Sequence, residues 1–108
     1  DLNVIAQIRC YEIVYGNMLG HTRPGGKKVK DLIKTEYGYV AGKHSDGLRH
    51  YGENIAYGQP NHSRAIAELI ASSGHYQNIV DPSFKKMGAG ALYDKAHSRW
   101  IRVQIFTS

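Results

Sequence analysis

The sequence predicts an α+β domain in which helices pack on an antiparallel sheet. Apolar residues recur at helical spacing between Leu2 and Tyr15, and they alternate with polar residues between Ser98 and Thr107. The chain has 108 residues, of which 42% are hydrophobic and 21% are charged. This length and composition suit one domain with one hydrophobic core.

The first predicted helix runs from Leu2 to about Tyr15 and is apolar on two sides. One stripe contains Leu2, Ile5, Ala6 and Ile13, and the other contains Val4, Ile8, Tyr11 and Tyr15. A helix that is apolar on two sides is expected to lie between two layers. Gly16 and Gly20 end the pattern, so a loop beginning with His21 follows this helix.

The middle of the chain predicts a second, short helix and a long loop. Val29, Leu32 and Ile33 indicate a helix that ends near Gly38. Residues 39–52 show no sustained period and are rich in Gly, His and Ser, which is typical of a loop. A short buried strand is expected directly after this loop.

A third helix is predicted from apolar residues at Ala65, Ile66, Leu69 and Ile70. Either Asn61 or Ser63 could cap its first turn, since both side chains can accept a hydrogen bond from exposed amides. Gly74 is expected to end this helix, immediately before His75.

The C-terminal third predicts a β-hairpin formed by residues 86–93 and 98–107. In its second strand one face carries Arg99, Ile101, Val103 and Ile105, and we expect this aliphatic face to lie under a helical layer. Gly88 and Gly90 in the first strand leave room for a bulge or for close approach of another backbone.

Composition also excludes several classes of protein. The net charge of +5 comes from basic residues spread along the chain, with one short cluster at Lys27, Lys28 and Lys30. This is not the basic stripe of a nucleic-acid-binding protein, so we predict no nucleic-acid partner. No apolar run approaches the roughly 18 residues of a membrane span. A single cysteine, Cys10, excludes an internal disulfide framework.

Five motifs in order then carry a family resemblance: HTRPGG at 21–26, GENIAYG at 52–58, SSGHYQNI at 72–79, MGAG at 87–90 and VQIF at 103–106. The chain resembles the CAP superfamily (cysteine-rich secretory proteins, antigen 5 and pathogenesis-related proteins), also called SCP domains, in its disulfide-free bacterial form. The resemblance implies a three-layer α-β-α sandwich with a central antiparallel sheet. It implies one domain over residues 1–108, without the usual first N-terminal helix, in an extracellular or cell-envelope-associated protein.

The resemblance also implies a cleft lined by His21, Glu53 and His75. Two imidazoles and one carboxylate can hold Zn²⁺ with an open fourth position, so His21 and His75 are the candidate metal ligands. Glu53 would be the third ligand or a partner that orients one of them. The plain alternatives are a helix-capping loop histidine at position 21, a solvated histidine at position 75 and a carboxylate that accepts backbone amides at position 53.

Two functions follow from this resemblance. The first is a binding domain whose cleft takes a small molecule, a lipid or a cell-envelope component, with or without a divalent metal. The second is a metal-dependent hydrolase in which His21 and His75 activate a water and Glu53 acts as the base. No Ser or Cys nucleophile matches a family motif and the HExxH zinc motif is absent, so we favour binding.

Overall fold

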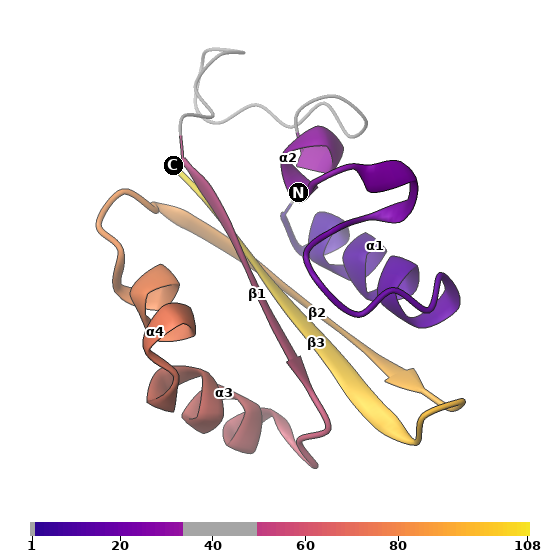
Figure 1. Cartoon of the computed structure of the whole chain (residues 1–108). Coiled ribbons are helices and arrows are strands. Elements are labelled where there is room, and N and C mark those ends of the chain that lie inside the picture. Colours follow the sequence, from indigo (N-terminus) through magenta and orange to yellow (C-terminus); the bar gives the residue numbers. More distant parts are fainter. Residues whose placement is uncertain (1, 34–49) are drawn as a thin grey trace.

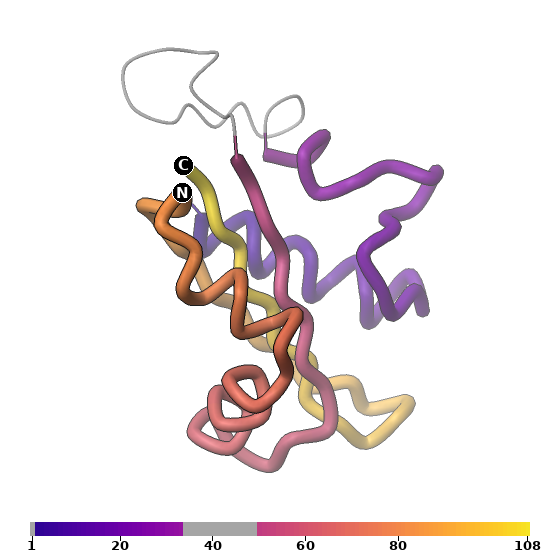
Figure 2. Tube along the Cα trace, turned by 60° about the vertical axis from the view of Figure 1, so that its left-hand side comes forward, coloured from indigo at the N-terminus to yellow at the C-terminus, as the bar shows by residue number. Residues whose placement is uncertain are grey.

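The computed structural model describes residues 2–33 and 50–108. Its elements in chain order are α1 (Leu2–Tyr15), the 3₁₀ turn η1 (Pro24–Gly26), α2 (Val29–Asp31), β1 (Tyr51–Tyr57), α3 (His62–Ala71), α4 (Ser73–Val80), β2 (Lys86–Asp94) and β3 (Arg99–Thr107). The strands form one sheet in the order β1-β3-β2 within the described residues. Helices α1 and α2 cover one face, and α3 and α4 cover the other (Figures 1 and 2). This is the predicted three-layer sandwich.

The central strand, β3, is antiparallel to both neighbours. Lys86 of β2 and Tyr51 of β1 both lie opposite Thr107, on either side of β3. At the other end of the hairpin, Asp94 pairs with Arg99. The predicted hairpin is therefore confirmed, with its first strand one residue longer and its second beginning one residue later than expected.

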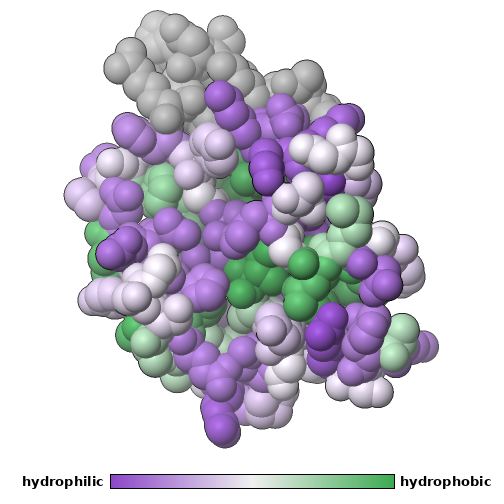
Figure 3. Space-filling view, viewed as in Figure 1, coloured by the Kyte–Doolittle hydropathy of each residue, from purple (hydrophilic) through white to green (hydrophobic). Residues whose placement is uncertain are grey.

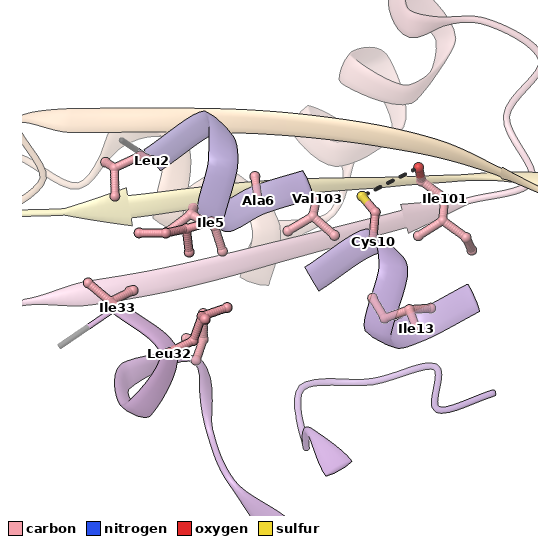
Figure 4. Close-up of a cluster of buried hydrophobic side chains, with 11 residues drawn as sticks. Leu2, Ile5, Ala6, Cys10, Ile13, Leu32, Ile33, Ile101 and Val103 are labelled. Carbon is pink, nitrogen blue, oxygen red and sulfur yellow. Dashed lines mark hydrogen bonds between the residues drawn. The ribbon is translucent and has the colours of Figure 1, made fainter. Parts of the chain in front are cut away.

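The main core lies between α1 and the sheet, as Figure 4 shows. Ile101, Val103 and Ile105 are at most 1% exposed, which confirms that the aliphatic face of β3 lies under a helix. The Cys10 thiol lies among them and donates to the carbonyl of Ile101 over 3.9 Å. Burial raises the pKa of Cys10 to about 12, so the thiol stays protonated and unreactive at neutral pH.

Helix α1 lies directly on the backbone of β2, which is why β2 carries glycines on this face. A Cβ atom on Gly88 would lie 2.2 Å from the carbonyl carbon of Leu2. A Cβ atom on Gly90 would lie 2.7 Å from the amide nitrogen of Gln7. The close backbone approach expected at these two positions is therefore confirmed.

The expectation that α1 is buried on both sides is wrong. Within the second apolar stripe, Val4 is 44% exposed, Tyr11 is 50% exposed and Tyr15 is 75% exposed. Only one side of α1 faces the sheet. The two tyrosine rings instead stack on each other, with centroids 5.6 Å apart, which shields part of their apolar surface from water.

Helix α3 begins as predicted, and Asn61 is its cap. The Asn61 side-chain oxygen accepts a hydrogen bond from the backbone amide of Arg64 over 2.9 Å. Ala65 and Leu69 then bury one side of the helix against Ala56 of β1. Ile66 and Ile79 pack against this cluster and are only partly buried.

The predicted end of the third helix at Gly74 is wrong. Helix α3 ends at Ala71, and Ser72 takes an extended conformation with φ −94° and ψ 119°. A separate helix, α4, follows, and both Gly74 and His75 lie in its first turn. The sequence of α4 is too polar to show an apolar period, so pattern analysis could not separate the two helices.

The segment between α1 and β1 is described only in part. Helix α2 covers Val29–Asp31, and Leu32 and Ile33 follow it into the core. The predicted end near Gly38 and most of the predicted loop lie outside the described residues. Tyr51 and Gly52 were expected in that loop but belong to β1, because they pair with β3. In the part of the chain that is described, no helix has the length and apolar character to cross a membrane.

Candidate functional site

Strand β1 points neighbouring side chains of the GENIAYG motif to opposite faces of the sheet. The Glu53 carboxylate faces α1 and accepts a hydrogen bond from Arg9. The Asn54 amide faces α4 and donates to the carbonyl of His75 over 3.1 Å. Since β1 is at the edge of the described sheet, residues held on both faces can lie along this one edge.

His21 and Glu53 form a hydrogen-bonded pair. The His21 Nδ1 atom lies 2.8 Å from Glu53 Oε1. The His21 side chain is 61% exposed, whereas the Glu53 side chain is 3% exposed. A buried carboxylate therefore holds an imidazole ring that remains accessible to a ligand.

Arg9 of α1 is the centre of the charge cluster behind this pair. Its side chain is 1% exposed, and its Nε atom donates to Glu53 Oε2 over 2.6 Å. Its Nη1 atom donates to Glu12 over 3.0 Å, and its Nη2 atom donates to the carbonyl of Gly20 over 2.7 Å. Arg9 thus connects α1 to β1 and to the loop that carries His21.

Glu12 extends the cluster to a second buried arginine, Arg23. The Arg23 Nε and Nη2 atoms donate to the two Glu12 oxygens over 2.8 and 2.7 Å. Burial raises the pKa of Glu12, but the hydrogen bonds from Arg23 and Arg9 outweigh it, so this pKa lies below its usual value of 4.5.

His75 is held by a separate, uncharged network on the other face of the sheet. Its Nδ1 atom lies 2.9 Å from the hydroxyl of Ser72, the residue before α4. Asn54, which holds the His75 carbonyl, also accepts a hydrogen bond from Asn78 over 2.8 Å and donates to Gln104 over 3.1 Å. These amides fix the first turn of α4 against β1.

The structure brings two of the three predicted residues into contact. His21 and Glu53 share a hydrogen bond, whereas the His75 ring is bonded to Ser72. Among residues 2–33 and 50–108, no three His, Cys, Asp or Glu side chains are grouped closely enough to hold a metal ion. The convergence of all three side chains on one cleft stays a prediction.

Sequence analysis did not identify Arg9 as part of the site, although a signal was present. Arg9 is four residues from both Ile5 and Ile13, so it stands in the apolar stripe of α1 that faces the core. A charged residue in a buried stripe requires a hydrogen-bonded partner of opposite charge. The identity of that partner, Glu53, depends on the folded chain.

Cavities also lie on the α3 and α4 side of the sheet, lined by residues other than the three predicted ones. One has a volume of about 280 Å³ and is lined by His62, Ala65 and Leu69 of α3 and by Ala91 of β2, among others. Another, of about 260 Å³, is lined mostly by apolar side chains, which come from α3, α4, β2, β3 and Phe84. Figure 3, drawn from the side where β1 lies in front, shows a mostly hydrophilic surface with an apolar patch near its middle and smaller apolar areas elsewhere.

Two solved structures share this fold. An extracellular protein containing an SCP domain, from Bacillus anthracis str. Ames, superimposes with a TM-score of 0.77 at 24% sequence identity. The match covers 98% of this chain but only 31% of that protein. An outer surface protein from Borrelia burgdorferi superimposes with a TM-score of 0.76 at 17% identity, and the match covers 99% of this chain and 72% of that one.

The sequence itself places the chain in a family. No curated protein matches this chain. The profile of the cysteine-rich secretory protein family, CAP, matches residues 1–106, which is nearly the whole chain. Together with the three-layer fold, this match shows that the chain belongs to the CAP family.

Proposed function

We propose that this chain is the CAP domain of an extracellular or envelope-associated protein, and that it binds a small molecule, a lipid or an envelope component at His21 and His75. The observation that carries this proposal is the exposed His21 ring held by the buried Glu53 carboxylate. A buried Glu53 carboxylate that orients a solvent-exposed His21 ring is an arrangement typical of a binding site. One of the two similar structures is of an extracellular protein and the other is of an outer surface protein, which supports the location.

Glu53 does not fit the role of third zinc ligand. Arg9 and His21 already occupy its two oxygens, and a guanidinium 2.6 Å away would repel a dication. The contacts fit a carboxylate that orients a histidine. A divalent ion bound here would be held by His21 and His75, and it would supply Lewis acidity. The hydrolase alternative gains no support, because Glu53 is not free to act as a base.

The test compares the wild type with His21→Ala, His75→Ala and the matched control His97→Ala. His97 is an exposed histidine that is hydrogen-bonded to Asp94 at the hairpin, away from the site. The probes are vesicles of anionic phospholipid, soluble fragments of cell-wall polymer and a peptide library, each with added zinc or with a chelator. We expect the wild type and His97→Ala to bind at least one of these probes equally well. His21→Ala and His75→Ala should bind the same probe at least about tenfold more weakly.

Two results would contradict the proposal. If all four proteins retain the same probes equally, the ligand does not use these histidines. If the wild type cleaves a probe and both the chelator and His75→Ala abolish that cleavage, the metal-dependent hydrolase is the better description.

A further inference from the structure

We infer that Arg9 is the positioning residue of the His21–Glu53 pair, and that it makes His21 Nε2 the atom that the site offers to a ligand. This inference rests on the proposed function for its biological meaning, but its geometry stands by itself. Arg9 holds His21 from two directions. It donates to the carboxylate that binds the ring, over 2.6 Å, and to the carbonyl of Gly20, the residue before His21, over 2.7 Å.

The guanidinium shape is what allows one side chain to make these contacts. Its donors form a rigid planar fork, and in Arg9 they reach Glu53, Glu12 and the Gly20 carbonyl at the same time. The Arg9 side chain is only 1% exposed, so these partners replace water around its charge. A lysine carries a single compact ammonium group and cannot span the same three acceptors.

Fixing Glu53 in this way removes it from direct contact with a ligand. Its Oε2 atom accepts from Arg9 Nε, and its Oε1 atom accepts from His21 over 2.8 Å and from Arg9 Nη2 over 3.4 Å. The side chain is 3% exposed. A ligand therefore meets the histidine ring, and Glu53 acts through that ring.

The pairing also sets which ring nitrogen carries the proton. An ionised carboxylate only accepts hydrogen bonds, so the His21 nitrogen that faces it, Nδ1, must be the donor. In the neutral ring the other nitrogen, Nε2, then holds a lone pair. Since the ring is 61% exposed, the site presents a hydrogen-bond acceptor to solvent. Its ligand would place an N–H or O–H donor, or a metal ion, at His21 Nε2.

The experiment is long-range ¹H–¹⁵N NMR of the histidine rings at pH 7.5 without ligand, which reports the protonated nitrogen of each ring. The His21 signals are assigned by their loss in His21→Gln. We expect Nδ1–H and an unprotonated Nε2 in the wild type. In Arg9→Gln we expect this fixed pattern to be lost and replaced by the averaged pattern of a free, exposed histidine. Arg9→Lys keeps the charge but not the fork, and we expect it to resemble Arg9→Gln.

The matched control is Arg23→Gln, which removes the other buried arginine of the cluster. Arg23 donates to both oxygens of Glu12 and to the carbonyl of Lys28, whereas Glu53 and the Gly20 carbonyl accept from Arg9, so the His21 pattern should be unchanged. If Arg9→Gln does not fold, Arg9→Lys decides the question.

A wild-type His21 with a protonated Nε2 contradicts the inference, and so does an unchanged His21 pattern in a folded Arg9 variant. These spectra need no ligand. A failure to find any ligand therefore counts against the proposed function and leaves the role of Arg9 to be decided by the spectra.

Discussion

The two faces of the sheet are packed in different ways. On the α1 face, eleven buried apolar residues from α1, residues 29–33 and β3 form one continuous core. On the opposite face, only Ala56, Ala65 and Leu69 are buried in the corresponding cluster of the described residues, and cavities of about 280 and 260 Å³ lie beside it. The α1 face therefore provides most of the apolar burial of the described fold.

The polar groups that hold the two histidines also differ between the faces: they are charged on the α1 face and neutral on the α4 face. On the α1 face, charged side chains of both signs hold His21: Arg9 and Glu53 are buried, and the partly exposed Glu12 binds Arg9. On the α4 face, neutral amides hold His75 through Asn54. The networks around His21 and around His75, called here the charged half and the uncharged half, both contact the edge strand β1. That the two halves form one cleft stays a prediction.

The largest expected effect comes from placing a charge in the α1-face core. Val103 is 1% exposed and faces α1, so Val103→Asp should destabilise the fold by about 3–5 kcal/mol because it buries a charge without a partner. Met87, on the opposite face of β2, is 54% exposed, so Met87→Asp should change stability by no more than about 0.5 kcal/mol. Urea unfolding of both variants checks the difference. Similar losses in the two would show that the faces are not packed differently.

A second, smaller effect comes from adding one methyl group at a glycine. Gly88→Ala would place a carbon 2.2 Å from the Leu2 backbone, and we expect a loss of about 1–3 kcal/mol as α1 is pushed away from β2. Gly74→Ala is the matched control in α4, where a Cβ atom would meet nothing within 4 Å. It should stabilise the protein by about 0.4–1 kcal/mol, because alanine restricts the unfolded chain. Thermal unfolding that shows the same sign for both would contradict the comparison.

The smallest expected effect is a pH dependence that belongs to the charged half alone. The pKa of Glu12 is lowered in the folded state, so its contribution is present above the usual value of 4.5 and is lost as pH falls through the lower folded value. Glu12→Gln should therefore cost about 1 kcal/mol at pH 7 and progressively less below pH 4.5.

Asn78→Ala is the control for this pH dependence, because it breaks a hydrogen bond to Asn54 in the amide network, which does not titrate. Its cost should be the same at pH 7 and at pH 3. A constant cost for Glu12→Gln, measured by urea unfolding over the same range, would mean that the charged half does not contribute in this way.

Patterns within single segments of the sequence predicted helix α1, strand β3 and the close approach of α1 to β2. The alternation in β3 and the helical spacing in α1 are visible in consecutive residues, and the glycine at position 88 signals close approach of another backbone. The structure contains all three features. Helix α4 was missed because its residues are mostly polar and partly exposed, so burial leaves no period in the sequence.

The candidate site was predictable only in part, for a different reason. The resemblance of the HTRPGG, GEN and GH motifs singled out His21, Glu53 and His75. The hydrogen bonds that give these residues their roles come from Arg9 and Asn54, which lie in other elements or point to the other face. No pattern within one segment reports such contacts, because they exist only after three distant segments have packed together.

The central claim is that His21 and His75 act as one site at the edge of β1. The most direct measurement records the ring signals of the six histidines by ¹H–¹³C NMR while the best-retained probe is added to the wild-type protein. We predict that His21 and His75 shift together, at the same probe concentrations, while His97 and His62 stay unchanged. His62, the first residue of α3, lines the apolar cavity of about 280 Å³. A shift of His62 without a shift of His21 and His75 would place the ligand in that cavity and contradict the account.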